Sequence, residues 1–252
     1  MELRETTALV AGGSGTVGRA VVAALARAGA DVVVGYHTDE AGADEAVERA
    51  REAGRAATAV AADLTDAAET AALVDAAVER FESRFGVLVD CSGRTDPRSI
   101  KRLDRATVSE LLETNVTGSV GLAREAVGRF REDGEGGSVV VVTSVAAELG
   151  TVDAGYATAK AGLHGFVRAL ARECGADGVR VNAVVPGPVE SPMNDDVLEH
   201  LEATRFRGHR TVDTLLDRYE AQPEEVAAAA RFLATQPFVT GEFLHVDGGM
   251  SL

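Results

Sequence analysis

Short runs of Val, Leu and Ala alternate along the whole chain with longer stretches in which apolar residues recur at helical spacing. The short runs are typical of strands buried on both faces of a parallel sheet, and the longer stretches predict amphipathic helices. The predicted strands cover residues 8–10, 31–35, 58–62, 87–90, 138–143, 179–184 and 243–246. The predicted helices cover residues 17–28, 41–53, 66–84, 109–131 and 156–174.

This regular alternation predicts an α/β fold, because a helix between two strands usually joins parallel neighbours by a right-handed crossover. We expect one doubly wound parallel sheet of about seven strands flanked by helices. No tandem repeat or low-complexity linker divides residues 1–252, which predicts a single domain. One irregular polar segment, residues 191–222, separates the sixth and seventh predicted strands, and its length predicts a lid or substrate-binding segment.

Composition narrows the class of protein. Apolar residues make up 46% of the chain, but only 4% is aromatic and Trp is absent, so the core must consist mainly of Val, Leu and Ala. No apolar run reaches the roughly 18 residues that a membrane helix needs, and the N-terminus lacks the blocks of a signal peptide. A net charge of −15 argues against nucleic acid or an anionic membrane as a partner.

The chain has two cysteines, Cys91 and Cys174, which cannot form a disulfide framework and do not have metal-site spacing. This usage predicts reduced thiols and a cytoplasmic protein. No cluster of His, Cys and carboxylate residues has ligand spacing, so no metal site is predicted.

The first predicted strand leads directly into a glycine-rich turn and a helix start, residues 9–18. Gly12 permits a tight turn, and the small residues after it would let a pyrophosphate approach the backbone. The N-terminus of the following helix offers unpaired N–H donors. Such a turn can be a simple connection, but directly after the first strand of an α/β chain it predicts a dinucleotide site.

A phenol and an ammonium, Tyr156 and Lys160, lie four residues apart and therefore on one face of a predicted helix. Only two of the 25 basic residues are lysines, the other being Lys101. A compact ammonium favours the phenolate, so the phenol can act as an acid or base, which an Arg would serve less well. Ser144 ends an apolar run twelve residues upstream and could hydrogen-bond a substrate oxygen. Together these residues predict an oxidoreductase active site.

With these motifs the chain resembles the short-chain dehydrogenase/reductase family, in its single-domain branch, over nearly its whole length. The family's T-G-x-x-x-G-x-G motif stands at residues 11–18, with Ala11 for Thr and Thr16 for the middle Gly. The resemblance implies a Rossmann-type NAD(P)-binding domain. It also implies a catalytic tetrad, in which the first member holds a water that relays protons to the lysine. The tetrad would be Asn115, Ser144, Tyr156 and Lys160.

The resemblance also implies which residues contact the cofactor. The family's N-N-A-G motif is altered to Asp90-Cys91-Ser92-Gly93, and its P-G-x-x-x-T loop ends in Ser191 instead of Thr. The implied contacts are Gly12, Ser14, Gly15, Thr16, Val17, Tyr36, His37, Asp63, Leu64, Cys91, Ser92, Gly93, Tyr156, Lys160, Pro186, Gly187, Val189 and Ser191.

The end of the second strand bears on the choice between NADP and NAD. Tyr36 stands where an NAD enzyme usually has a carboxylate for the ribose hydroxyls, while His37 and Thr38 could donate to a 2′-phosphate. Against this, Gly15 stands where many NADP enzymes of the family have a cation, and acidic residues occupy 39–40. We predict NADP, with NAD as the alternative.

The predicted function is an NADP-dependent oxidoreductase acting on a carbonyl or secondary alcohol, most similar to the 3-oxoacyl-carrier-protein reductases. One alternative is an NAD-dependent dehydrogenase of a sugar, polyol or other secondary alcohol. Another is a nucleotide-sensing regulator without turnover, although such proteins commonly lose the Tyr or Lys. Arginines could dock an acidic carrier protein or pair with carboxylates of the chain itself; they are Arg129, Arg131, Arg168 and Arg172.

Substrate selectivity is expected in residues 94–98 and in the lid, where Arg205, Arg207 and Arg210 could suit an acidic substrate or pair with neighbouring carboxylates. We interpret His164 as a residue of the helix surface or an interface, and His245 as a half-buried strand residue. The resemblance further implies a homotetramer built on the helices 109–131 and 156–174 and the last strand. Small residues would permit close helix packing there, namely Ala157, Ala161, Gly162 and Gly165.

Overall fold

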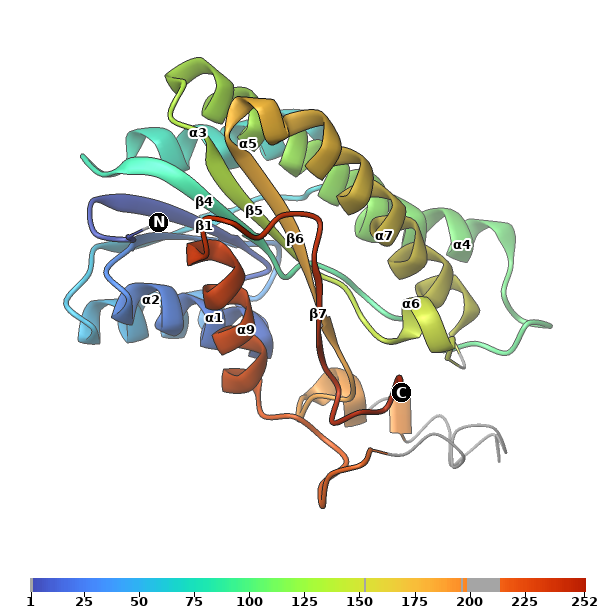
Figure 1. The fold of residues 1–252 in the computed structure, drawn as a ribbon. Helices are drawn as coiled ribbons and strands as arrows, with labels where there is room; N and C mark the ends of the chain where they lie inside the picture. Colours follow the sequence, from blue (N-terminus) through green and yellow to red (C-terminus); the bar gives the residue numbers. More distant parts are fainter. Residues whose placement is uncertain (1, 152, 196, 199–213) are drawn as a thin grey trace.

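The computed structural model describes residues 2–151, 153–195, 197–198 and 214–252, and these form a parallel sheet in the order β3-β2-β1-β4-β5-β6-β7 (Figure 1). Every neighbouring pair of strands is parallel. The strands are β1 (Thr6–Ala11), β2 (Asp31–Tyr36), β3 (Ala57–Ala61), β4 (Arg84–Asp90), β5 (Gly137–Val142), β6 (Val179–Pro186) and β7 (Phe243–Val246).

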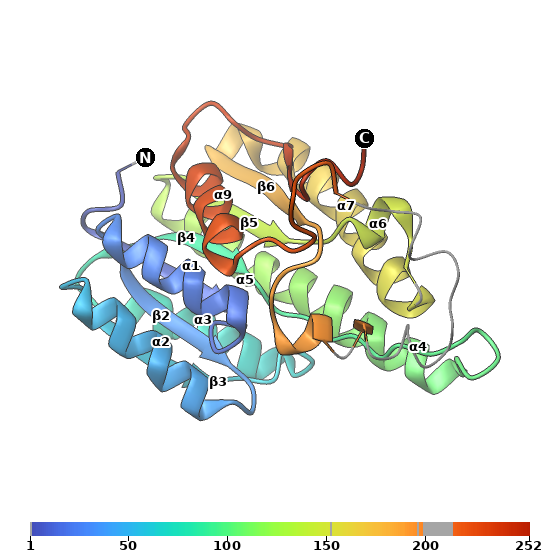
Figure 2. The same ribbon diagram turned by 90° about the horizontal axis from the view of Figure 1, so that it is seen from below.

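Helices cover both faces of this sheet, which makes three layers (Figures 1 and 2). One face carries α1 (Thr16–Arg27), α2 (Glu40–Glu52) and α9 (Pro223–Thr235). The other carries α3 (Ala67–Glu79), α5 (Gly118–Asp133) and α7 (Ala154–Cys174). The remaining elements are short: α4 (Arg105–Leu112), the π-helical η1 (Glu113–Thr117), α6 (Ala146–Leu149) and the 3₁₀ turn η2 (Gly175–Asp177).

Two apolar clusters, one on each face of the sheet, form the core. Successive residues of a strand point to opposite faces, so Val10 packs toward α1 and α9 while Leu9 packs toward α3 and α5. All six residues of β1 and of β5 are buried. The prediction of a doubly wound α/β sheet with a core of Val, Leu and Ala is therefore confirmed.

The predicted helix over 109–131 is wrong in its boundaries and in its continuity. Helix α4 begins earlier, at Arg105, because Asp104 caps it by accepting a hydrogen bond from the Thr107 N–H at 2.9 Å. The π-helical segment η1 then separates α4 from α5. π-Helical turns are often found at functional sites, and this one contains Asn115.

Two further predictions at the helix boundaries need correction. The helix predicted to reach residue 84 ends at Glu79, and Arg84 instead begins β4, where it pairs with Thr6 of β1. Helix α9 was not predicted. Its sequence does contain a start signal, because Pro223 occupies the first turn and the Glu225 carboxylate accepts a hydrogen bond from the Gln222 N–H at 2.8 Å.

The predicted lid over 191–222 is described only at its two ends. The later end returns to the sheet region, since Ala221 forms an isolated parallel bridge with Val189 after β6. Arg205, Arg207 and Arg210 lie outside the described residues. Among the helices of the described ranges, none has both the length and the apolar character that a bilayer span requires.

The strand order reverses direction between β1 and β4. The chain leaves β1 toward α1 on one face, and it leaves β4 toward α4 and α5 on the other. A crevice forms at the carboxyl edge of such a sheet, and ligands of open α/β folds bind there.

Candidate active site

A cavity of about 1340 Å³ lies at this carboxyl edge. It is lined by the ends of β1, β2, β4, β5 and β6 and by the start of α7. All the residues that the sequence predicted for catalysis or cofactor contact line it, with the exception of Asn115, which is fully buried behind it. Its lining includes both the glycine turn and Tyr156.

The glycine motif after β1 leaves no room for a side chain at Gly12 or at Gly18. Gly12 has a φ of +64°, and a Cβ there would lie 2.8 Å from the backbone of Cys91 and Ser92. A Cβ at Gly18 would overlap the carbonyl oxygen of Gly12. Helix α1 begins directly after this turn, at Thr16, so its first N–H groups face the cavity. This cradle fits a pyrophosphate group.

The ends of β2 and β3 form the side of the cavity beyond the glycine turn. His37 Nε2 lies 3.8 Å from the Asp63 carboxylate, whose pKa is held below its usual value by hydrogen bonds from the Thr65 N–H and hydroxyl. Asp39 caps α2, where its carboxylate accepts a hydrogen bond from the Gly42 N–H at 3.0 Å. Asp39, one of the two acidic residues that argued against NADP, is therefore bound at the N-terminus of α2, which stabilises its negative charge.

Arg19 is a cavity residue that the sequence reasoning missed. Its guanidinium donates to the Ser14 carbonyl, and its Nε lies 3.4 Å from Glu45 of α2. The signal was its place directly after the last glycine of the motif. Arg19 brings a cation to the side of the cavity where Gly15 has none.

The altered segment after β4 folds back on itself. The Asp90 carboxylate is 2% exposed and accepts hydrogen bonds from the N–H of Ser92 at 2.9 Å and from its hydroxyl at 2.5 Å. Burial, with Asp90 alongside, raises the pKa of the Cys91 thiol far above its usual value, so this thiol stays protonated.

Ser144, Tyr156 and Lys160 meet at the other end of the cavity. Lys160 is 4% exposed, and its Nζ donates to the Val142 carbonyl at 3.0 Å and lies 5.7 Å from the centre of the Tyr156 ring. Ser144 Oγ accepts a hydrogen bond from the Ala146 N–H at 3.1 Å. Its hydroxyl proton has no partner among the described residues, so it is available to a ligand oxygen in the cavity.

Asn115 lies behind this group, in the π-helical segment η1. Its Nδ2 donates to the carbonyls of Arg94 and Leu111, and its Oδ1 accepts from the Arg94 N–H at 3.1 Å. Gly93 has a φ of +151°, and a Cβ there would lie 2.7 Å from Asn115 Oδ1 and 3.3 Å from Lys160 Nζ. The amide oxygen of Asn115 is therefore close to Lys160 across Gly93.

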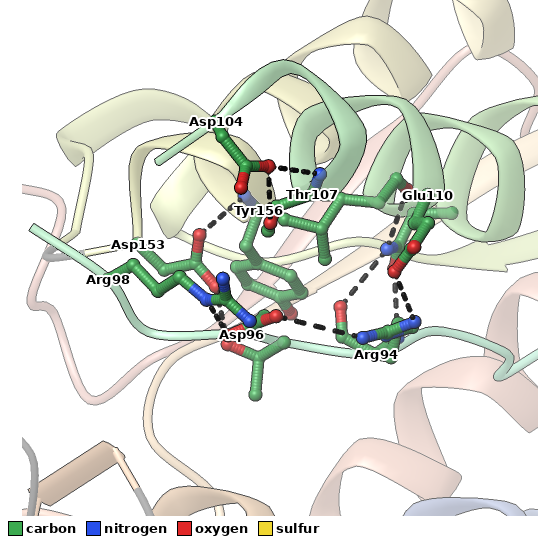
Figure 3. A network of polar contacts seen from close by, with 11 residues as sticks. Arg94, Asp96, Arg98, Asp104, Thr107, Glu110, Asp153 and Tyr156 are labelled. Carbon is green, nitrogen blue, oxygen red and sulfur yellow. Dashed lines mark hydrogen bonds and ion pairs between the residues drawn. The ribbon is translucent and has the colours of Figure 1, made fainter. Parts of the chain in front are cut away.

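A network of polar contacts surrounds the first turn of α7 (Figure 3). Asp153, directly before the helix, accepts hydrogen bonds from the Tyr156 N–H, the Thr95 hydroxyl and the Asp96 N–H. Arg94 lies 3.5 Å from Glu110 and 3.8 Å from Asp96, both in the same network. The sequence singled out residues 94–98 for selectivity but missed Asp153, although a helix-capping Asp three residues before Tyr156 was a usable signal.

The interpretation of His164 as a residue of the helix surface or an interface is wrong, because this residue is buried within the chain itself. Tyr156, Lys160 and His164 are spaced four residues apart, so the helix face that turns Lys160 toward the sheet turns His164 there too. Its Nε2 lies 3.1 Å from Thr143 Oγ1, and its ring lies 4.5 Å from that of Phe243. Glu148 lies beside it and also contacts His245, whose side chain is one-third exposed.

A doubly wound parallel sheet with this cavity at its switch point defines a dinucleotide-binding α/β protein. Comparison with known proteins narrows the class. A family profile described as Enoyl-(Acyl carrier protein) reductase matches residues 11–251.

The 3-oxoacyl-acyl-carrier-protein reductase of Synechocystis sp. is 35% identical to this chain, and the alignment covers 98% of both. Glucose 1-dehydrogenase 2 of Bacillus subtilis is 32% identical, with 100% of this chain and 96% of that protein covered. A short-chain dehydrogenase of Mycobacterium paratuberculosis bound to NAD superposes with a TM-score of 0.92 at 25% identity, covering 100% of this chain and 99% of that one.

The chain therefore belongs to the short-chain dehydrogenase/reductase family. It is an oxidoreductase that uses a nicotinamide cofactor, and its substrate is a small carbonyl compound or alcohol.

Proposed function

We propose that this chain is an NADP-dependent oxidoreductase in which Asn115, Ser144, Tyr156 and Lys160 carry the chemistry, within one domain formed by residues 1–252. The observation that carries the proposal is the convergence of Ser144, Tyr156 and Lys160 on the cavity that also contains the glycine turn. The glycine turn would hold the pyrophosphate, and the loop at Pro186, Gly187, Val189 and Ser191 would hold the nicotinamide end. When bound, the cofactor supplies or takes up the hydride.

Tyr156 is the acid and base of this proposal. In reduction its phenol gives a proton to the substrate oxygen, and in oxidation it takes that proton back. Lys160 stabilises the phenolate by its charge, while its hydrogen bond to Val142 fixes the ammonium. Asn115 donates both Nδ2 protons to backbone carbonyls. Its Oδ1 keeps a lone pair that would accept a hydrogen bond from a water, and this water would relay protons to Lys160.

Ser144 positions the substrate oxygen. Its Oγ accepts from the Ala146 N–H, which orients the hydroxyl and leaves its proton free to donate. A donor fixed before the reaction stabilises negative charge on that oxygen without further reorganisation.

Four residues support NADP over NAD. Tyr36 places no carboxylate at the end of β2, while Arg19, His37 and Thr38 border the same part of the cavity as donors. Against this, Arg19 is shared with Glu45, and Asp63 lies across from His37. An NAD enzyme acting on a sugar or polyol is the second candidate, supported by the likeness to glucose 1-dehydrogenase 2.

Reduction of a 3-oxoacyl thioester is the first substrate class we propose, on the likeness to the Synechocystis reductase. Three of the four arginines considered for carrier docking give it little support, while Arg172 is exposed on α7. Arg129 pairs with Asp75 and Glu132, Arg131 pairs with Asp177, and Arg168 lies over the ring of Phe243. Free thioesters are therefore the better first test.

The decisive experiment titrates NADPH and NADH by fluorescence and measures turnover with an acetoacetyl thioester and with glucose. We expect NADPH-dependent turnover of the thioester, and a loss of at least about a hundredfold in Tyr156→Phe with cofactor binding retained, since general acid–base catalysis contributes that much.

The two lysines provide a matched control. Lys160→Met should abolish turnover, whereas Lys101→Met, which alters an exposed loop, should leave it unchanged. NAD-dependent oxidation of glucose would favour the second candidate. Full activity in Tyr156→Phe would reject the catalytic assignment.

We also propose a homotetramer that acts in the cytoplasm. The outer sides of Ala161, Gly162 and Gly165 are exposed on α7, and β7 is an edge strand of the sheet. Both cysteines are unpaired thiols. Light scattering on the eluting protein gives the mass directly, and a monomer at micromolar concentration would contradict the assembly.

A further inference from the structure

Asp153 is a buried carboxylate that the mechanism above does not use. It is 2% exposed, and no cation lies within 4.0 Å of it in the described part of the chain. Three hydrogen bonds stabilise its charge instead: from the Tyr156 N–H at 2.9 Å, the Thr95 hydroxyl at 2.8 Å and the Asp96 N–H at 2.7 Å. A buried carboxylate needs such donors, so this contact is costly to break.

The two oxygens of Asp153 accept hydrogen bonds from different segments of the chain (Figure 3). Oδ1 accepts from Tyr156 and so caps the helix that carries the catalytic phenol. Oδ2 accepts both donors of the loop that follows β4. Only a side chain with two acceptor oxygens can bind both segments in this way.

The same loop is fixed on its other side. Both the N–H and the carbonyl of Arg94 are hydrogen-bonded to the Asn115 side chain. Residues 94–96 are therefore hydrogen-bonded to Asn115 at one end and to Asp153 at the other. Arg94, Thr95 and Asp153 all line the cavity, and Figure 3 shows Arg94 and Asp153 close to Tyr156.

We propose that Asp153 is a positioning residue that sets the place of the substrate-facing loop relative to Tyr156. The loop forms one wall of the space that a substrate must occupy, and the phenol forms another. Because the Asp153 carboxylate bonds to both the loop and the first turn of α7, a substrate bound by the loop lies in a fixed position relative to the Tyr156 phenol. This inference rests on the proposed function, in which Tyr156 is the acid and base.

The cap and the loop contact can be separated by substitution. In Asp153→Ser the hydroxyl still caps α7, since Ser is as good a capping residue as Asp, but it is too short to reach Thr95 and Asp96 as well. Thr95→Val removes one of the same hydrogen bonds from the other side and keeps the shape of the side chain. Asp104→Ser is the matched control, because Asp104 caps α4 in the same network without contacting residues 94–96.

We expect Asp153→Ser to lower kcat/KM for the carbonyl substrate by on the order of tenfold or more, through misplacement of the substrate. Affinity for NADPH should stay within about twofold of the wild type, because Asp153 bonds to α7 and to the loop after Gly93 and not to the glycine turn. Thr95→Val should show a smaller loss of the same kind, and the double variant should be no worse than Asp153→Ser alone, since both remove one interaction.

Amide hydrogen exchange provides a readout that does not depend on turnover. In Asp153→Ser and Thr95→Val, the amides of residues 94–98 should exchange faster than in the wild type, while in Asp104→Ser they should not. If Asp153→Ser and Asp104→Ser change exchange and kcat/KM alike, Asp153 is merely a helix cap and the inference is overturned. Absence of wild-type turnover with every carbonyl tested would instead reject the proposed function, and exchange would still decide whether Asp153 holds the loop.

Discussion

The carboxylate of Asp90 is buried at the end of β4, in the centre of the sheet. One of its oxygens accepts two hydrogen bonds from Ser92, while Oδ2 is buried without a hydrogen-bond partner. Among the described residues, no basic nitrogen lies within 4.0 Å of it. A buried charge with one unpaired oxygen is a destabilising feature.

We therefore expect Asp90→Asn to stabilise the protein at neutral pH by about 1–2 kcal/mol, because the amide removes the charge and keeps an acceptor for Ser92. Urea unfolding of the apoprotein measures this. Asp90→Ala is the control, and it should destabilise, because it removes the acceptor as well as the charge. A lower midpoint for Asp90→Asn than for the wild type would contradict the interpretation.

Helix α9 depends at its C-terminus on a side chain from the sheet. Arg180 of β6 donates to the carbonyls of Leu233 and Ala234 at 2.7 and 2.6 Å and to that of Val239 at 3.3 Å. Burial lowers the pKa of this guanidinium from its usual value. The last carbonyls of a helix lack partners within it, and here the Arg supplies them.

Replacing this side chain should separate α9 from β6. We expect Arg180→Met to lower the free energy of unfolding by about 2–3 kcal/mol, since buried carbonyls lose charged donors. The matched control is Arg124→Met on α5, whose exposed guanidinium pairs with the neighbouring Glu125, and little change is expected there. Chemical denaturation of both variants gives the comparison, and equal losses would reject the capping role.

At the scale of the molecule, a cluster of charged groups joins α6, α7 and β7. Burial lowers the pKa of His164, and Glu148 of α6 opposes this shift. Arg168 and Lys160 of α7 and His245 of β7 are the other charges that face it, and they favour the neutral ring. The Thr143 hydroxyl donates to the Val184 carbonyl, so His164 Nε2 carries the proton of the contact with Thr143.

The sign of the pH dependence follows from this lowered pKa. Well above pH 6.5 the ring is neutral in both the folded and the unfolded chain, so it contributes nothing to the pH dependence of the free energy of unfolding. Below that pH the unfolded chain binds a proton before the folded one, and stability falls as pH decreases toward the folded pKa, by at most about 1.4 kcal/mol per pH unit.

Unfolding in urea between pH 5 and pH 8 tests this dependence. His164→Gln keeps a donor for Thr143 and should remove that part of the slope. His245→Gln, which alters a side chain that is one-third exposed, should leave most of it. Identical slopes in the wild type and His164→Gln would show that this residue does not control acid stability.

Several features follow from the sequence alone. Mostly apolar runs predicted the strands, because a strand buried on both faces has few polar positions. The glycine turn and the Tyr156–Lys160 pair depend on local spacing, so their placement at the cavity could be predicted. Helix α9 was missed although its start signal was readable, and the break at η1 could not be read, because a π-helical turn depends on packing around Asn115.

Contacts between distant segments were decided only by the tertiary structure. The contacts of Asp153 with residues 95–96, of Arg180 with the carbonyls at and just after the end of α9, and of His164 with Thr143 join residues that lie 21 to 59 positions apart. A sequence fixes which face a residue occupies on its own element by periodicity, but which groups meet that face depends on how the elements pack. The fold class and the chemistry of the cavity were therefore predictable from the sequence, whereas the network that positions Tyr156 was decided by the packing of the loop after β4 against α7.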